Sequence, residues 1–177
     1  MSFEAGSIIK AFMMMGYMAS DPYGDANNNG FVINSPALGA NKEIPLIYTC
    51  KGQNISLPLS WSGVPKGARS LALVIYDEDT PWPNFYHWEV FNIPPSQHNL
   101  PADAHLAANE QEANNSWGKQ IYEGPCPTQG EHHYVIRLYA LDQNLSISAD
   151  KSPLELHRAM EDHIIAWAQT TGRFNAT

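Results

Sequence analysis

Residues 70–81 read SLALVIYDEDTP, an apolar run that changes abruptly into acidic residues and then reaches a proline. The run is rich in β-branched and aromatic side chains, which fit the pleated surface of a strand. Acidic residues and proline are typical of the turn that follows a strand. This segment predicts a buried strand whose end carries carboxylates, and the rest of the fold can be built outward from it.

Other segments have the same composition and are also bounded by Pro, Gly or Asn. They are Phe31–Asn34, Ile44–Tyr48, Phe85–Ile93 and His133–Leu141. We predict a strand in each of them, as in Ser70–Tyr76. No repeat of 20–50 residues is visible.

A helix signal is found only near the end of the chain. Residues 152–155 offer a serine N-cap, a proline at the first helical position and a capping-box glutamate. Four apolar residues then recur at helical spacing: Leu156, Met160, Ile164 and Trp167. Gly172 follows them as a stop signal. We therefore predict a C-terminal helix that continues toward Gly172.

Strands followed by a helix favour an antiparallel arrangement over alternating βαβ units. The predicted fold is mostly β, an antiparallel β-sandwich with peripheral helices, including a C-terminal helix. Residues 20–30 read SDPYGDANNNG, a turn-rich stretch that separates the N-terminal segment from the rest. We expect an N-terminal helical and loop extension over 1–30 and a single domain over 31–177.

Composition limits the classes of function. The chain has 177 residues, about one domain, and its formal net charge is −8, which argues against general nucleic-acid binding. No apolar run approaches the roughly 18 residues of a membrane span. The two cysteines, Cys50 and Cys126, allow one intramolecular disulfide, and neither lies in a CxxC or zinc-knuckle spacing.

The N-terminal segment bears on location. Residues 11–19 form an apolar run, AFMMMGYMA, but the residues before it balance Glu4 against Lys10 and so lack a clearly basic region. A cytoplasmic location is expected, with a periplasmic or secreted location as the alternative if this run is an export signal. The run is also a candidate partner or homodimer surface, since Met-rich apolar faces adapt to partners.

Polar groups gather at the ends of the predicted strands. Asp77 and Asp79 are two residues apart, so in an extended backbone both carboxylates point to the same side. The plainer alternative is an acidic turn that ends the strand and is closed by Pro81.

A histidine lies in the next predicted strand. Strict alternation puts His87, Glu89, Phe91 and Ile93 on one face and Trp88 and Val90 on the other. A single histidine beside tryptophan is most often a hydrogen-bonded core residue.

A third polar segment combines a loop with ring donors. Gly124 and Pro125 open a loop that leads into a strand in which His132 and Tyr134 share a face and His133 lies on the other. Imidazole and phenol groups donate hydrogen bonds, and a Gly-Pro loop lets a ligand approach the backbone. This combination suits an oxyanion.

Taken in order, these motifs resemble the phosphatidylethanolamine-binding protein family, and its bacterial Raf-kinase-inhibitor-like branch in particular. The resemblance runs from about Phe31 to Phe174. It is carried by residues 70–81, His87-Trp88, Gly124-Pro125-Cys126-Pro127 and Gly130-x-His132, with support from 48–56, 59–61, 64–65, 115–119 and 139–142.

The resemblance implies a β-sandwich with a small anion pocket at one end. By this resemblance the pocket is lined by Asp77, His87, Gly124, His132 and Tyr134, with Asp79, Pro81 and Pro125 at its rim and loop. Family members take phosphate-like groups, including phospholipid headgroups, and act mainly as binders or as inhibitors of kinases and proteases. No turnover, cofactor or metal is implied.

This chain departs from the family pattern at several positions. His133 stands where arginine is frequent, Leu57 replaces a common proline, and Phe174 stands where tyrosine is common, so a ligand bond from a C-terminal phenol is in doubt. Asp77 would repel an anion unless it is protonated or holds a histidine in its charged form. We expect Asp77 to orient or charge His87 or His132, so anion affinity should fall above a pH of roughly 6.5.

Two other classes of function remain open from the residues alone. A metal-dependent hydrolase could use Asp77, Asp79, His87 and His132 as ligands, although no HExxH-type signature is present. Alternatively, the pocket is vestigial and the chain is a protein-interaction module.

Overall fold

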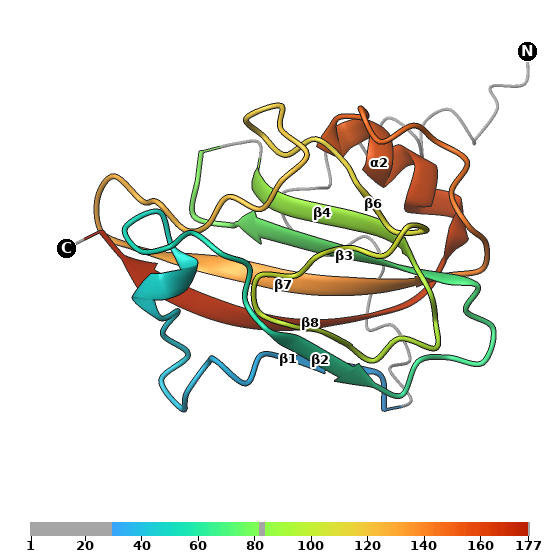
Figure 1. Ribbon diagram of the computed structural model, residues 1–177, viewed down its shortest axis with the longest axis horizontal. Helices are drawn as coiled ribbons and strands as arrows, with labels where there is room; N and C mark the ends of the chain where they lie inside the picture. Colours follow the sequence, from blue (N-terminus) through green and yellow to red (C-terminus); the bar gives the residue numbers. More distant parts are fainter. Residues whose placement is uncertain (1–29, 82–83, 177) are drawn as a thin grey trace, which may run out of the picture.

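The computed structural model describes residues 30–81 and 84–176, and within them two antiparallel sheets face each other (Figure 1). The smaller sheet has the order β1-β2-β5, with β1 at Val32–Asn34, β2 at Leu59–Ser62 and β5 at Asn99–Leu100. The larger sheet has the order β6-β4-β3-β7-β8. Its strands are β6 (Gln111–Glu112), β4 (Phe85–Ile93), β3 (Ser70–Asp77), β7 (Glu131–Leu141) and β8 (Ile164–Asn175).

Two apolar clusters fill the two sides of the large sheet. One lies between the sheets, where Trp61 of β2 packs with Leu73 and Ile75 of β3. The other lies between the large sheet and helix α2 (Pro153–Met160), which buries Leu156 and Met160. The predicted β-sandwich with a peripheral C-terminal helix is confirmed.

The sequence located the long central strands closely. β4 begins and ends where we expected, and β3 and β7 differ from the prediction by one or two residues at their ends. The reason is their composition, since β3 is buried on both faces along its whole length. The segment 70–81 thus forms the middle strand of the large sheet.

The predicted strand Ile44–Tyr48 is wrong. Only an isolated parallel bridge forms there, between Glu43 and Arg173, and a 3-10 helix, η2, then occupies Leu46–Tyr48. Pro45 has no N–H for a ladder, and its carbonyl instead accepts a hydrogen bond from Tyr48 N at 3.0 Å.

The C-terminal helix ends much earlier than the helical spacing predicted. α2 stops at Met160, a 3-10 turn, η3, covers Glu161–His163, and Ile164–Asn175 forms β8. Alternate residues of β8 from Ala166 onward are buried, a period of two that the β-branched residues Ile164, Ile165, Thr170 and Thr171 favour. The predicted capping box at Ser152 and Glu155 is confirmed.

The predicted extension over 1–30 lies outside the described residues except for Gly30. Among the helices that the structure describes, none has the length and hydropathy needed to cross a bilayer.

Candidate anion site at the end of the large sheet

The antiparallel register brings the predicted site residues to one end of the large sheet. Asp77, the last residue of β3, lies opposite Phe85 at the start of β4 and opposite Tyr134 near the start of β7. His87 and His132 lie within two residues of these partners. Segments separated by about 50 residues in sequence therefore place their side chains at the same end of the sheet.

A β-bulge in β4 determines where His87 points. Tyr76 pairs with Tyr86, but its neighbour Ile75 pairs with Trp88, so His87 is an extra residue in β4. His87 and Trp88 both lie on the face that packs toward the small sheet: Trp88 belongs to that core cluster, and His87 contacts Tyr134 of the same cluster. The strict alternation predicted for this strand is wrong.

The same strand places its acidic residue on the other face. Glu89 is fully buried, and its Oε1 lies 3.4 Å from Nε2 of His157 on α2. Phe91 belongs to the cluster beneath α2, whereas Ile93 has returned to the cluster between the sheets after a second register shift. Glu89 is therefore not part of the site that contains His87.

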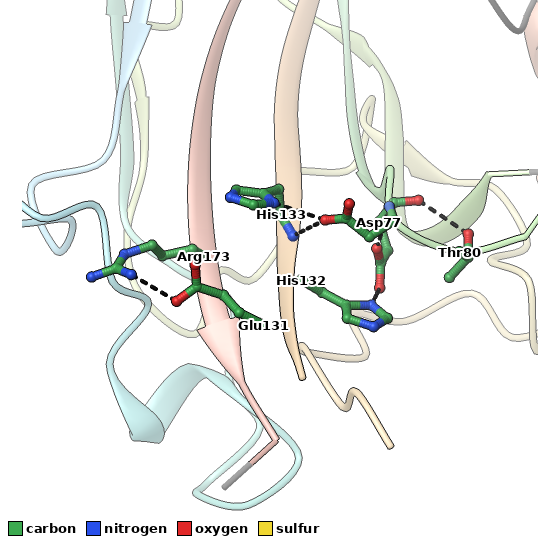
Figure 2. Close-up of polar contacts among 7 residues, drawn as sticks. Asp77, Thr80, Glu131, His132, His133 and Arg173 are labelled. Carbon is green, nitrogen blue, oxygen red and sulfur yellow. Dashed lines mark hydrogen bonds and ion pairs between the residues drawn. The ribbon is translucent and has the colours of Figure 1, made fainter. Parts of the chain in front are cut away.

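Asp77 and His132 form the central polar pair of the site. Nδ1 of His132 donates to Oδ2 of Asp77 at 2.6 Å, and the Asp77 side chain is almost fully buried (Figure 2). Oδ1 of Asp77 accepts the backbone N–H of Asp79 at 2.9 Å. Because both carboxylate oxygens have partners, Asp77 is a fixed acceptor that orients the imidazole of His132.

Asp79 does not join this pair, contrary to the prediction that both carboxylates point to the same side. β3 ends at Asp77, so strand alternation no longer applies, and Oδ2 of Asp79 accepts from the backbone N of His133 at 2.6 Å and from its Nδ1 at 2.8 Å. Burial alone would raise the pKa of Asp79, but the hydrogen bonds from His133 outweigh it and lower the pKa. The His132 and His133 rings lie apart in Figure 2, as predicted for alternating residues.

His87 is held by a backbone carbonyl instead of a carboxylate. Its Nδ1 lies 2.6 Å from the carbonyl oxygen of Glu123, so this nitrogen carries a proton and donates it. Burial lowers the pKa of His87, against the opposing effects of this hydrogen bond and of the Asp77 charge. The ring is therefore neutral at neutral pH, and only protonation of Nε2 gives it a second N–H donor.

Aromatic rings enclose His87. Its centroid lies 5.3 Å from that of Tyr134, 5.2 Å from Trp117 and 5.6 Å from Phe85, all in edge-to-face arrangements. The Tyr134 hydroxyl is buried and makes no hydrogen bond of normal geometry with the described residues. Burial and the neighbouring Asp77 charge raise the pKa of Tyr134, so its phenol is a neutral hydrogen-bond donor.

A cross-linked pair of loops supports the Glu123 carbonyl. The Cys50–Cys126 disulfide joins them, Cys50 N donates to Pro125 O at 3.1 Å, and Gly124 N donates to Oδ1 of Asn54 at 2.8 Å. Gly124 permits this contact, because a Cβ there would lie 2.2 Å from the carbonyl oxygen of Tyr48. The sequence left the disulfide open, and the structure shows that it forms.

Two of the remaining sequence-predicted residues lie at the margins. Pro125 is buried in the cross-linked loop, and Pro81 is exposed in the connection between β3 and β4, next to residues outside the described ranges.

Phe174 lies opposite His132 in the β7–β8 register. With Lys51 5.9 Å above its ring, Phe174 lines a surface depression of about 490 Å³.

Sequence reasoning missed three contributors to the site. Glu123 acts through its carbonyl and Asn54 through its side-chain amide, and neither role leaves a signal in residue type or spacing. Trp117 was noticed only within the segment 115–119, although the turn-forming Asn115 and Gly118 beside it could have indicated a fixed loop.

No three His, Cys, Asp or Glu side chains within 30–81 and 84–176 come together as a set that could hold a metal ion.

Comparison with known proteins bears on this architecture directly. The sequence model of the family described as phosphatidylethanolamine-binding protein matches residues 34–175. A UPF0098 protein of Methanothermobacter thermautotrophicus is 43% identical over 135 residues, which cover 74% of this chain and 89% of that protein. A UPF0098 protein of Chlamydia pneumoniae is 38% identical over 148 residues, covering 79% of this chain and 95% of that protein.

Solved structures agree with these matches. The crystal structure of CT736, a phosphatidylethanolamine-binding protein homologue of Chlamydia trachomatis, has a TM-score of 0.77 at 36% identity, covering 83% of this chain and 98% of that one. That of E. coli YbcL, described as a member of the mammalian family, has a TM-score of 0.78 at 28% identity, covering 84% of this chain and 99% of that one. With the family model spanning the whole large sheet and every residue of the candidate site, this chain belongs to the phosphatidylethanolamine-binding protein family.

Proposed function

We propose that the chain binds phosphate-like anions at the end of the large sheet, as the free phosphate group of a small molecule or of a phospholipid headgroup. The observation that carries the proposal is that two imidazole rings are held in the same way. His87 and His132 each commit Nδ1 to a fixed acceptor, the Glu123 carbonyl and the Asp77 carboxylate, both at 2.6 Å. Each ring is thereby oriented, with Nε2 as the ring nitrogen that is not committed to that acceptor.

Neutral donors complete the set. The buried phenol of Tyr134 lies beside His87 and close to the Asp77 carboxylate, and a neutral phenol can donate to an incoming oxygen. The net charge of −8 opposes anion binding only weakly, because charges in solvent that lie far from the site are screened over about 8 Å at physiological salt. Short-range hydrogen bonds therefore dominate.

Binding without turnover is the form of activity that this geometry supports. Asp77 already accepts from two partners, and the acidic residues suggested as metal ligands fall into separate pairs, Asp77 with His132 and Asp79 with His133. No observation favours the hydrolase alternative over binding. Inhibition or regulation of a kinase or protease is the further role that family membership suggests, with the anion site as the contact for a phosphorylated group.

The test is a titration of O-phosphoethanolamine into the protein, followed by NMR of the imidazole signals and by calorimetry. We expect two histidine signals to move together and saturably, and we expect His87→Ala and His132→Ala to abolish binding. His133→Ala is the matched control, since His133 is a neighbouring, exposed histidine paired with Asp79. Loss of binding in that control, or an unchanged affinity in His87→Ala, would contradict the proposal.

The disulfide adds an expectation about location. Disulfides persist in oxidising compartments and are rare in the reducing cytosol. The Cys50–Cys126 cross-link therefore favours the periplasmic or secreted alternative over the cytoplasmic one. Alkylation of free thiols in intact cells, followed by mass spectrometry, should find both cysteines protected.

A further inference from the structure

Trp117 lies next to the site with an exposed indole. Its ring centroid is 5.2 Å from that of His87 and 4.6 Å from that of Phe85, both close to perpendicular. Trp117 nevertheless remains 43% exposed, although burial of an aromatic ring is favourable. Single exposed apolar residues are common, so exposure alone says little.

The loop around Trp117 is built to hold it in this position. Asn115 is buried, and its Oδ1 accepts from the backbone N of Trp117 at 3.0 Å and of Lys119 at 3.1 Å. Its Nδ2 donates to the carbonyl of Ile121 at 3.0 Å. The tight turn is completed by Gly118, which has a φ of +73°. One buried amide thus organises the whole loop.

The loop is also fastened to the strand that carries His87. Tyr86 N donates to Oγ of Ser116 at 2.8 Å, and Ser116 N donates to the carbonyl of Tyr86 at 3.0 Å. Lys119 pairs with the carboxylate of Glu123 at 2.9 Å, and the carbonyl of Glu123 accepts from His87. The indole and the imidazole are therefore held in one hydrogen-bonded frame, which a merely solvated surface residue does not need.

We infer that Trp117 is a specificity-determining wall of the anion site and selects phosphate monoesters whose organic group is aromatic. The inference rests on the proposed anion site. The rings of Phe85, His87, Trp117 and Tyr134 form a connected edge-to-face set, and an aromatic group next to a phosphate bound at His87 extends that set against the exposed indole. Inorganic phosphate, which has no such group, gains nothing from Trp117.

The experiment measures dissociation constants by calorimetry for phenyl phosphate, O-phosphoethanolamine and inorganic phosphate. We expect the wild-type protein to prefer phenyl phosphate over inorganic phosphate by about fivefold or more, the size of one good aromatic contact. Trp117→Ala should abolish that preference by weakening the binding of phenyl phosphate more than that of inorganic phosphate, while Trp117→Phe should retain part of it. Leu154→Ala, which truncates an exposed apolar residue on α2, is the matched control and should change nothing.

The outcomes separate the two ideas. If the wild-type protein binds none of the three compounds, the anion site itself is wrong and the inference falls with it. If inorganic phosphate binds but phenyl phosphate binds no better, the site stands and the role of Trp117 is overturned. An equal loss of all three affinities in Trp117→Ala overturns it as well, because the residue would then act only on the fold. A preference for O-phosphoethanolamine that disappears in Trp117→Ala also overturns it, since the indole would then contact an ammonium group.

Discussion

Nδ1 of His87 donates to the backbone carbonyl of Glu123 at 2.6 Å, and this hydrogen bond fixes which nitrogen of the imidazole can respond to an anion. A carbonyl accepts and never donates, so Nδ1 keeps its proton at every pH at which the fold persists. If the proposed anion site is right, anion binding should therefore be coupled to proton uptake at the other ring nitrogen.

The first prediction concerns pH. Burial lowers the pKa of His87 from its ordinary 6.5, so the ring becomes a double donor only as the pH falls below that value. Sulfate is the suitable probe, because it does not titrate in this range. Its affinity should rise as the pH falls, by up to about tenfold per pH unit for one coupled proton. A constant affinity from about pH 8 to about pH 5.5 contradicts this account.

The second prediction concerns the disulfide. Cys50 and Cys126 are 76 residues apart, so the cross-link restricts a long loop in the unfolded chain and should contribute about 4 kcal/mol to stability. The paired substitution Cys50→Ser and Cys126→Ser should lower the free energy of unfolding by that order in urea titrations. Adding reductant should destabilise the wild-type protein and leave the double variant unaffected. Equal stability of the two proteins without reductant is the contrary result.

The third prediction concerns Gly124. A methyl group at this position meets the carbonyl oxygen of Tyr48 at 2.2 Å and Cα of Thr49 at 2.9 Å, both of them backbone atoms. Gly124→Ala should therefore destabilise the protein by about 1–3 kcal/mol and weaken anion binding, because the displaced loop carries the carbonyl that holds His87. Gly39→Ala is the control, since its nearest neighbour lies 3.6 Å away. Comparable effects of the two substitutions in thermal unfolding would show that the close approach at Gly124 does not matter.

The fourth prediction concerns the buried pair beneath α2. Burial raises the pKa of Glu89, against the effect of His157, so the folded protein holds this proton more tightly than the unfolded chain does. Stability should then fall as the pH rises from 4.5, the ordinary Glu value, toward the raised value in the folded state, by at most about 1.4 kcal/mol per pH unit. Glu89→Gln should remove that slope in urea titrations at several pH values, and Glu161→Gln, an exposed substitution on η3, should keep it.

Much of the fold could be read from the sequence because the central strands bury so much apolar surface. Composition predicts β3, β4 and β7, since a segment rich in Val, Ile, Tyr and Phe between turn residues is typical of a strand. β8 could not be read in the same way. Its buried Ala166, Ala168 and Gly172 are small and weakly apolar, so the helical spacing of Leu156, Met160, Ile164 and Trp167 gave the stronger signal.

The sequence predicted which residues would gather at the candidate site better than it predicted how they are arranged there. The resemblance indicated Asp77, His87, His132 and Tyr134, and register brings all of them to one end of the sheet. The bulge at His87 could not be foreseen, because strand alternation assumes an unbroken ladder. The role of Glu123 is equally hidden, since a backbone carbonyl is present in every residue.

The cross-link between Cys50 and Cys126 has a consequence for the fate of a damaged molecule. It closes a covalent ring that contains β2 through β6, strands of both sheets. A protease that cuts once inside that ring leaves two pieces that still travel together, as a single band until a reductant is added. The nicked molecule can keep its strands paired, so a single cut in the backbone of this protein need not destroy its fold.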